Sequence, residues 1–155
     1  GDPVGKVDPT GLGYRDVWVQ NWNSLNSAEK ALAKSWRATQ LLSYYNASKA
    51  ALKRAQAKFP GWALKNDKAD AFRHAYWNAA LSRLIGRKSA KVWTDAHETG
   101  AVGQPWREKS MDLHNNFVGR DVSSTYWSLQ MTGGRDNVEG RILSSGRLWW
   151  FGNGV

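Results

Sequence analysis

Apolar residues recur at intervals of three and four along most of this chain, the spacing that gathers them on one face of an α-helix. Leu25, Leu32 and Trp36 form such a series beside the polar pair Asn26-Ser27, and they predict a helix that continues to about residue 39. A second, basic helix follows and ends at Pro60-Gly61. No segment of convincing length alternates apolar and polar residues as a half-buried strand does. The pattern therefore predicts a mainly α-helical protein.

Residues that start and stop helices divide the rest of the chain. Asp67 is placed to cap one helix and Gly86 to end it, and Pro105 suits the first turn of another. These signals predict helices at about residues 67–85, 89–99, 105–127 and 138–143. Residues 1–13 are rich in Gly, Pro and Asp and predict a linker. We expect residues 14–155 to form a single compact domain of about five helices, with the apolar segment 148–151 packed on its core.

Composition narrows the class of protein. Hydrophobic residues make up 41% of the 155 residues, which is typical of a globular domain and not of a disordered chain. The absence of cysteine excludes disulfides and thiolate metal sites. The sequence shows neither an apolar run long enough to span a bilayer nor a signal peptide, so we expect a soluble domain. Ten tryptophans exceed what such a core requires: most are expected to fill the core or cover the ends of the domain, and others to form a wall for a base, sugar or lipid.

Positive charge dominates the chain but is spread unevenly. There are 22 Lys and Arg against 13 Asp and Glu, a formal net charge of +9. The bases prevail in the N-terminal third, where the helical spacing of Lys30, Lys34 and Arg37 places them on one face. The acids concentrate near the histidines. Such a basic face predicts a polyanionic partner, with nucleic acid first; an anionic membrane surface or an acidic inhibitor would use the same charge.

The chain has three histidines, and each stands among carboxylates or amides. They are His74, His97 and His114, within the segments Asp70–His74, Asp95–Glu98 and Asp112–Asn116. Histidine exchanges a proton near neutral pH and is the commonest metal ligand. We expect the three segments to assemble one site.

The first segment has the clearest geometry. Asp70, His74 and Trp77 lie at i, i+4 and i+7, so one helical face presents all three. Arg73 lies beside that row and is expected to bind a phosphate, because a guanidinium is a planar, permanently charged fork. Arg73 and Trp77 are therefore candidate substrate-binding residues.

The other two segments offer further candidates. Asp95 and Glu98 share a helical face, whereas His97 projects about 100° away from Glu98. Around His114, the side chains of Asp112, Asn115 and Asn116 are suited to bind a metal ion, to hold an imidazole tautomer or to contact substrate. The candidate catalytic residues are His74, His97, His114, Glu98 and Asp95, and the candidate metal ligands are His74, Asp70, Asp95, Asp112 and His114.

Two mechanisms fit these residues. A divalent cation held by imidazole and carboxylate would activate water and neutralise charge on a phosphate. Alternatively, two histidines would act as general base and acid without a metal, which suits RNA because its 2′-hydroxyl supplies the nucleophile. The carboxylates near the histidines favour the metal. No HExxH, HNH or cysteine zinc motif, GxSxG elbow or Walker glycine loop is present, so serine hydrolysis and nucleoside triphosphate turnover fit poorly.

Two stretches of the sequence resemble known families. The segment Asp8–Leu12 (DPTGL) resembles the DP-x-GL motif that closes the shell of Rhs and related YD-repeat proteins. The resemblance implies a shell that encapsulates a C-terminal toxin, cleavage after Leu12, and Asp8 as the autoproteolytic aspartate. It also implies a cognate immunity protein and delivery into a target cell by a type VI or related system. The motifs RHAYW, DAHE and MDLHNN resemble an uncharacterised helical domain found at the ends of bacterial polymorphic toxins.

Together these observations predict an antibacterial toxin domain that hydrolyses phosphodiester bonds of nucleic acid at a histidine and carboxylate site. Two alternatives stay open. One is a membrane-lipid-directed toxin such as a phospholipase, with tryptophans and basic helices docked on the bilayer. The other is a non-enzymatic toxin that binds a membrane or a protein. Loss of the histidines would inactivate either enzyme and spare a pure binder.

Overall fold

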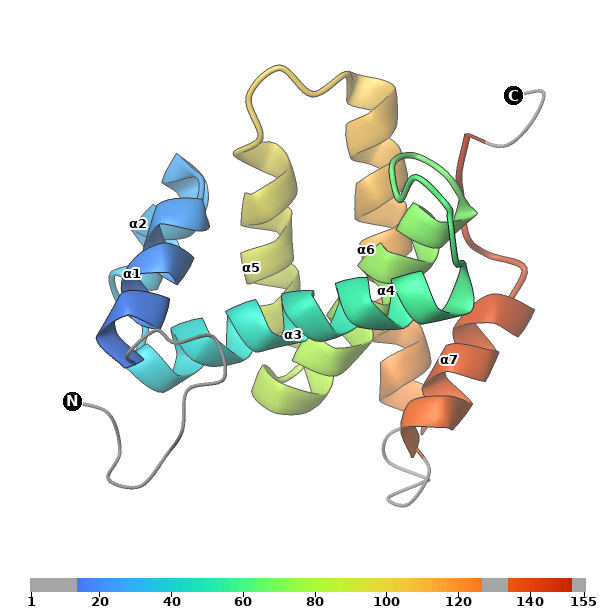
Figure 1. The fold of residues 1–155 in the computed structure, drawn as a ribbon, viewed down its shortest axis with the longest axis horizontal. Coiled ribbons are helices and arrows are strands. Elements are labelled where there is room, and N and C mark those ends of the chain that lie inside the picture. Colours follow the sequence, from blue (N-terminus) through green and yellow to red (C-terminus); the bar gives the residue numbers. More distant parts are fainter. Residues whose placement is uncertain (1–13, 127–133, 152–155) are drawn as a thin grey trace.

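The computed structural model describes residues 14–126 and 134–151, and their side chains over 19–124 and 138–151. Helices account for the regular structure of these residues, and no strand occurs among them. The helices are α1 (Tyr14–Ser24), α2 (Ser27–Ala33), α3 (Ala38–Lys58), α4 (Lys68–Ile85), α5 (Arg87–Thr99), α6 (Trp106–Tyr126) and α7 (Gly134–Ser144) (Figure 1). The expected mainly α fold is confirmed, with seven helices in the described residues in place of about five. No helix among these residues is both long and apolar enough to cross a membrane.

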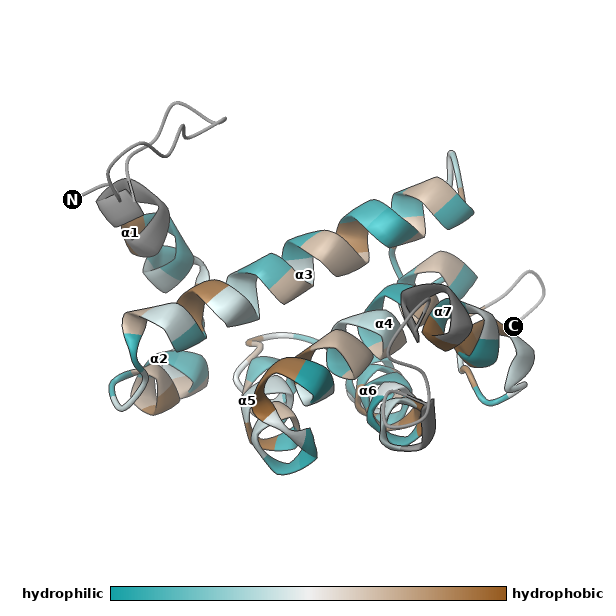
Figure 2. Ribbon diagram, turned by 90° about the horizontal axis from the view of Figure 1, so that it is seen from below, coloured by the Kyte–Doolittle hydropathy of each residue, from teal (hydrophilic) through white to brown (hydrophobic). Residues whose placement is uncertain are grey.

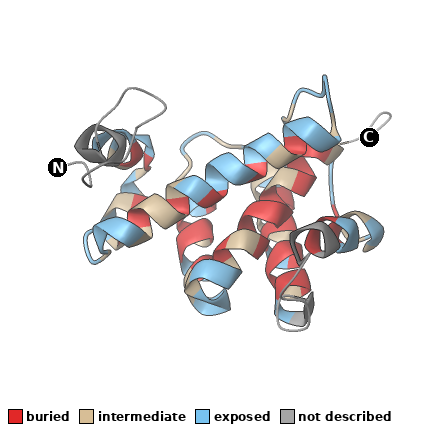
Figure 3. Ribbon diagram, turned by 60° about the horizontal axis from the view of Figure 1, so that its bottom comes forward, coloured by how far each residue is buried: buried red, intermediate tan, exposed pale blue. Residues whose placement is uncertain are grey.

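Helix α4 lies at the centre of the domain and contacts α3, α5, α6 and α7. The long helix α3 crosses one side of the layer that contains α4, α5 and α6 (Figure 2). Buried residues gather on the facing sides of these helices (Figure 3). Local signals set the limits of α4, as predicted. The side chain of Asp67 accepts a hydrogen bond from the backbone N–H of Asp70 at 2.8 Å, and Gly86 ends the helix with a φ of 89°.

The contact between α4 and α6 requires a glycine. Gly119 of α6 lies directly against the backbone of Ala75 in α4, where a Cβ atom would overlap the Ala75 carbonyl oxygen. Without a side chain at this position, the two helix backbones approach closely. The approach brings the polar residues one and two turns before Gly119 next to those of α4.

The prediction of one continuous helix over residues 26–39 is wrong, because this range contains α2, a break and the start of α3. Helix α2 ends at Ala33, and Arg37 is extended, with a ψ of 155°, before α3 begins. Between them Trp36 turns inward and stacks on Trp93 of α5, with ring centroids 3.4 Å apart. The break satisfies its own backbone, because Gln40 Oε1 accepts a hydrogen bond from Arg37 N at 2.8 Å. The break thus coincides with the packing of the partly buried Trp36 indole against Trp93.

As a result, Lys30, Lys34 and Arg37 do not share one helical face. Lys30 lies on α2, whereas Lys34 and Arg37 flank the break.

The segment 145–151 runs without helix from α7 back along α6. Leu148 is buried, as expected for an apolar plug, but Trp149 and Trp150 are exposed. Asn115 of α6 holds the segment with both amide atoms: its Nδ2 donates to Trp149 O at 2.8 Å, and its Oδ1 accepts from Trp149 N at 2.9 Å. The segment is therefore held on α6 by hydrogen bonds to the backbone of Trp149, whereas the Trp149 and Trp150 side chains stay exposed.

Candidate functional site

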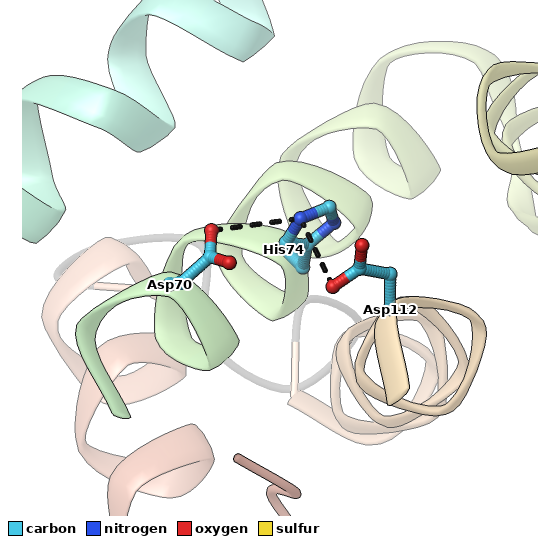
Figure 4. Close-up of side chains that lie close together, drawn as sticks. All are labelled: Asp70, His74 and Asp112. Carbon is cyan, nitrogen blue, oxygen red and sulfur yellow. Dashed lines mark ion pairs between the residues drawn. The ribbon is translucent and has the colours of Figure 1, made fainter. Parts of the chain in front are cut away.

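His74 lies buried where α4, α5 and α6 meet. Its Nε2 is 3.6 Å from Asp70 Oδ1 and 3.4 Å from Asp112 Oδ1, and both carboxylates point toward the ring (Figure 4). On the other side, Nδ1 is 3.1 Å from Asn116 Oδ1 and 3.9 Å from Glu98 Oε1. An amide oxygen only accepts, so Nδ1 carries the hydrogen and Nε2 keeps its lone pair. That lone pair then faces two carboxylate oxygens, one of which also accepts from the Arg73 guanidinium.

Asp70, His74 and Asp112 together form a group that could hold a metal ion. Each offers one ligand atom, and these atoms all lie within 4.8 Å of one another. Imidazole with carboxylate oxygens is a donor set found around several divalent cations, including zinc and manganese. A cation between these atoms would replace the repulsion of lone pair and carboxylates by attraction.

The two carboxylates differ in how they are supported. Asp70 Oδ2 accepts from the backbone N–H of Asn66 at 2.8 Å, and its Oδ1 accepts from Arg73 at 2.7 Å. Asp112 Oδ2 accepts from Gln104 Nε2 at 2.8 Å, but its Oδ1 has no hydrogen-bond donor. Glu98 Oε2 is buried without a donor as well. The site thus contains buried acceptor oxygens that a cation or a proton would satisfy.

Burial dominates the protonation of this site. Burial, reinforced by the charges of Asp112 and Asp70, raises the pKa of Glu98 to about 9. Burial also raises the pKa of Asp112. It lowers the pKa of His74, although Asp112 and Asp70 favour the charged imidazole. Without a cation, His74 is therefore neutral and Glu98 protonated at neutral pH.

His97 of α5 forms a second unit beside His74. Its side chain is 47% exposed, and its Nδ1 lies 3.2 Å from Glu29 Oε2. Because a carboxylate only accepts, Nδ1 donates and Nε2 is left as the proton acceptor. Glu29 is held in turn by Tyr44, whose hydroxyl donates to Oε2 at 2.5 Å, and by Asn26 N, which donates to Oε1 at 2.9 Å.

The carboxylate of Glu29 stays ionised in this unit. Burial would raise its pKa, but the hydrogen bond and charge of His97, with the bonds from Asn26 and Tyr44, lower it below its usual value. Burial and the charge of Glu29 raise the pKa of Tyr44, so the phenol remains a donor. This arrangement fixes the His97 ring and its tautomer.

Two cavities meet at this pair of histidines, and Arg73, His74 and His97 line both. The first, which we call the carboxylate cavity, has a volume of about 230 Å³ and is lined also by Asp70, Glu98, Gln104, Glu108 and Asp112. The second, the aromatic cavity, has a volume of about 200 Å³ and is lined also by Asn21, Leu25, Leu41, Tyr44, Tyr45 and Trp77. His74 and His97 therefore line both cavities, which together we call the cleft.

His114 and Asn115 lie outside this cleft. His114 Nε2 is 2.6 Å from Arg147 O, and its ring stacks on Trp149 with centroids 3.6 Å apart. With Asn115, it anchors the segment 145–151. The expected convergence of three histidines is corrected to two, because only His74 and His97 line the cleft.

Other predicted site residues divide in the same way. Asp95 lies on the outer side of α5, with its carboxylate on Lys91 Nζ. Lys30, Lys34 and Arg37 line neither cavity. Asp8 and Leu12 lie outside the described residues. Trp77 is in place, with its ring centroid 6.3 Å from that of His74.

Helical spacing separates the members of α6 that enter the site from those that do not, once the face packed on α4 is known. Asp112, Asn116 and Gly119 lie at i, i+4 and i+7 and face α4, whereas His114 is about 200° from Asp112. No such spacing identifies Glu29 as a site residue. It forms a capping box with Asn26, and this local role of one carboxylate oxygen gives no indication that the other oxygen contacts His97. Nothing in the local sequence singles out Tyr44.

The fold and the site define the chain as an all-helical domain with a buried histidine and carboxylate cluster in a cleft. Residues 31–139 match the family described as Domain of unknown function (DUF6973), and the chain belongs to that family. The matched region includes His74, His97 and the carboxylates around His74, but not Glu29. No solved structure matches the chain.

Proposed function

We propose that this domain is a hydrolase that cleaves phosphodiester bonds of nucleic acid with a divalent cation held by Asp70, His74 and Asp112. One observation carries the proposal. The Nε2 lone pair of a buried, neutral imidazole faces two carboxylate oxygens at 3.4 and 3.6 Å. The separation is too long for a hydrogen bond of good geometry but leaves room for a cation.

The residues around the cluster suit attack on a phosphate. A bound divalent cation stabilises charge on the phosphate and lowers the pKa of water. Arg73 already contacts Asp70 and keeps a partly exposed guanidinium at the junction of the cavities, where it would bind a phosphate oxygen. Water oxygen forms the new bond to phosphorus, and the bond to the leaving oxygen breaks. His97 Nε2 takes the proton of the water and returns it to the leaving oxygen.

The biological setting follows from the sequence. The DPTGL segment and the RHAYW, DAHE and MDLHNN motifs resemble polymorphic toxins, and a net charge of +9 favours a polyanionic substrate. In this proposal, the domain is the cargo of an Rhs shell, is delivered into a competing cell, and is neutralised by an immunity protein in the producing cell. The same charge favours an acidic surface on that immunity protein.

The experiment incubates the purified domain with DNA, RNA and liposomes, with EDTA and after addition of Mg²⁺, Mn²⁺ or Zn²⁺. We expect cleavage of DNA or RNA that EDTA abolishes. The variants His74→Ala and Asp112→Asn should lower the rate by about 100-fold or more, because each removes a ligand and outer-shell losses alone reach about that size. His114→Ala is the matched control, since His114 lies outside the cleft, and it should keep the rate of the parent.

Cleavage that persists in EDTA would refute the metal, and equal loss in His114→Ala would refute the assignment of the site. Absence of cleavage of both polymers with every cation would refute the nuclease.

A lipid-directed hydrolase is the second candidate, and one observation favours it. Leu25, Leu41 and Trp77 give the aromatic cavity apolar walls that would accept an acyl chain. Release of fatty acid or headgroup from liposomes, without cleavage of nucleic acid, would select this candidate.

A further inference from the structure

We propose that the aromatic cavity binds a single unpaired base of the nucleic acid substrate, so that the phosphate of that nucleotide lies at Arg73 and His74. The inference rests on the proposed function and adds the part of the substrate that is recognised. It names Asn21 and Trp77 as the residues that read the base.

Polar atoms without partners distinguish this cavity. Asn21 of α1 is 1% exposed, yet neither its Oδ1 nor its Nδ2 has a hydrogen-bond partner. Trp77 is 6% exposed, and its Nε1 also has none. Both residues line the aromatic cavity. A buried donor or acceptor without a partner destabilises a protein, and most buried polar groups are paired. These three atoms have almost no accessible surface, so a ligand in the cavity would pair with them once the Asn21 and Trp77 side chains turn toward it.

The chemistry of these atoms favours a base over an acyl chain. An asparagine amide offers one acceptor and one donor side by side, which match adjacent polar atoms on the edge of a base, as in asparagine recognition of adenine. The indole N–H of Trp77 adds a donor. The aromatic rings of Tyr44 and Trp77, with centroids 5.4 Å apart, provide apolar surface for a planar ring. An acyl chain would leave all three polar atoms unpaired.

The position of the cavity sets the form of the substrate. Arg73, His74 and His97 line both the aromatic and the carboxylate cavity, so a base in the first would place its own phosphate beside these three residues. A base enters an enclosed cavity only when it is unpaired and unstacked. A volume of about 200 Å³ suits one base. The domain should therefore prefer single-stranded substrate and read one nucleotide at the cleavage site.

The test measures binding without turnover. The domain in EDTA is titrated with each of four nucleoside 5′-monophosphates and with ribose 5-phosphate, which carries the same phosphate and no base, and calorimetry gives the affinities. We expect at least one nucleotide to bind about 10-fold or more tightly than ribose 5-phosphate, the factor expected for one net hydrogen bond with stacking.

Two variants remove the proposed contacts and keep the shape. Asn21→Leu should reduce nucleotide affinity to that of ribose 5-phosphate, and Trp77→Phe should reduce it several-fold by removing the N–H. Asn21→Leu should also raise the melting temperature, because two unpaired buried polar atoms are replaced by apolar ones. An asparagine with only a structural role would not show a lower nucleotide affinity together with a higher melting temperature on substitution. Asn23→Leu, an exposed position on the same helix, is the matched control and should leave affinity unchanged.

Nucleotides that bind no better than ribose 5-phosphate would overturn the inference. Unchanged nucleotide affinity in Asn21→Leu would also overturn it. In a parallel titration with octanoate, binding that becomes tighter in Asn21→Leu would overturn it as well. Failure of the proposed function looks different: base-dependent binding that Asn21→Leu removes, with no cleavage of any polymer, would support the base site and refute the nuclease. Cleavage without base-dependent binding would do the reverse.

Discussion

Gly119→Ala is the sharpest test of how the α4 and α6 contact supports the site. An added Cβ atom would overlap the carbonyl oxygen of Ala75 and lie 2.6 Å from its carbonyl carbon and 2.8 Å from its Cα. These are backbone atoms within α4, so no side-chain rotation relieves the overlap. The two helices must move apart.

The expected size of the effect follows from two opposing contributions. Alanine favours a helix over glycine by about 1 kcal/mol. Overpacking of a well-packed interior destabilises by about 1–3 kcal/mol and occasionally more, and a clash with backbone belongs at the upper end. We expect Gly119→Ala to lower the free energy of unfolding by about 2 kcal/mol. For a domain of this size, that change corresponds to a melting temperature lower by roughly 4–8 °C.

Gly140→Ala is the matched control. Gly140 is an exposed residue of α7, and a Cβ atom there would meet nothing within 4 Å. The same substitution should therefore raise the free energy of unfolding by about 0.5–1 kcal/mol. Urea unfolding followed by circular dichroism gives both values, with unchanged slopes if only stability moves.

The site should respond together with the fold. Separation of α6 from α4 displaces Asp112 from His74, so Gly119→Ala should also weaken the binding of the proposed cation. A Gly119→Ala protein as stable as the parent, or one that shifts as Gly140→Ala does, would refute the close helix contact on which the site depends.

Three further predictions concern other buried groups. In EDTA, Glu98 keeps its proton in the folded protein up to a pKa of about 9, but in the unfolded chain only up to about 4.5. The stability that this difference provides is complete below pH 4.5 and is lost as the pH rises through 9. In urea unfolding at a series of pH values, the parent should lose about 3 kcal/mol of stability by pH 7, and Glu98→Gln should remove that loss. Arg54→Met removes the ion pair of Arg54 with the buried Glu139 carboxylate and leaves Lys58 Nζ at 3.7 Å from that carboxylate. The substitution should lower the free energy of unfolding, measured in urea, by about 2–3 kcal/mol. An unchanged free energy would show that the Arg54 pair does not stabilise the fold. Asn115→Ala removes both hydrogen bonds to Trp149 and should open the segment 145–151 to chymotrypsin, with a melting temperature lower by a few degrees; equal resistance to the protease would show that the segment is held by other contacts.

The sequence by itself determined the features that depend on neighbours along the chain. Asp67 and Gly86 bound α4 through a cap and a left-handed glycine, and an i, i+4 spacing places Asp70 and His74 on one face. The relative placement of two of the three members of the candidate metal group was therefore predictable from spacing alone. These relations link residues a few positions apart, so they do not depend on how the rest of the chain packs.

Tertiary packing decided which of the remaining polar residues meet His74 and His97. Residues of α6 rotate by about 100° per position, so the face that Gly119 presses against α4 brings in Asp112 and Asn116 and turns His114 toward the segment 145–151. Glu29 reaches His97 across 68 positions of sequence through the packing of α2 on α5. Local spacing does not predict such distant contacts, because they depend on the packing of large side chains such as Trp36 against Trp93 and on the close approach of backbones at a glycine.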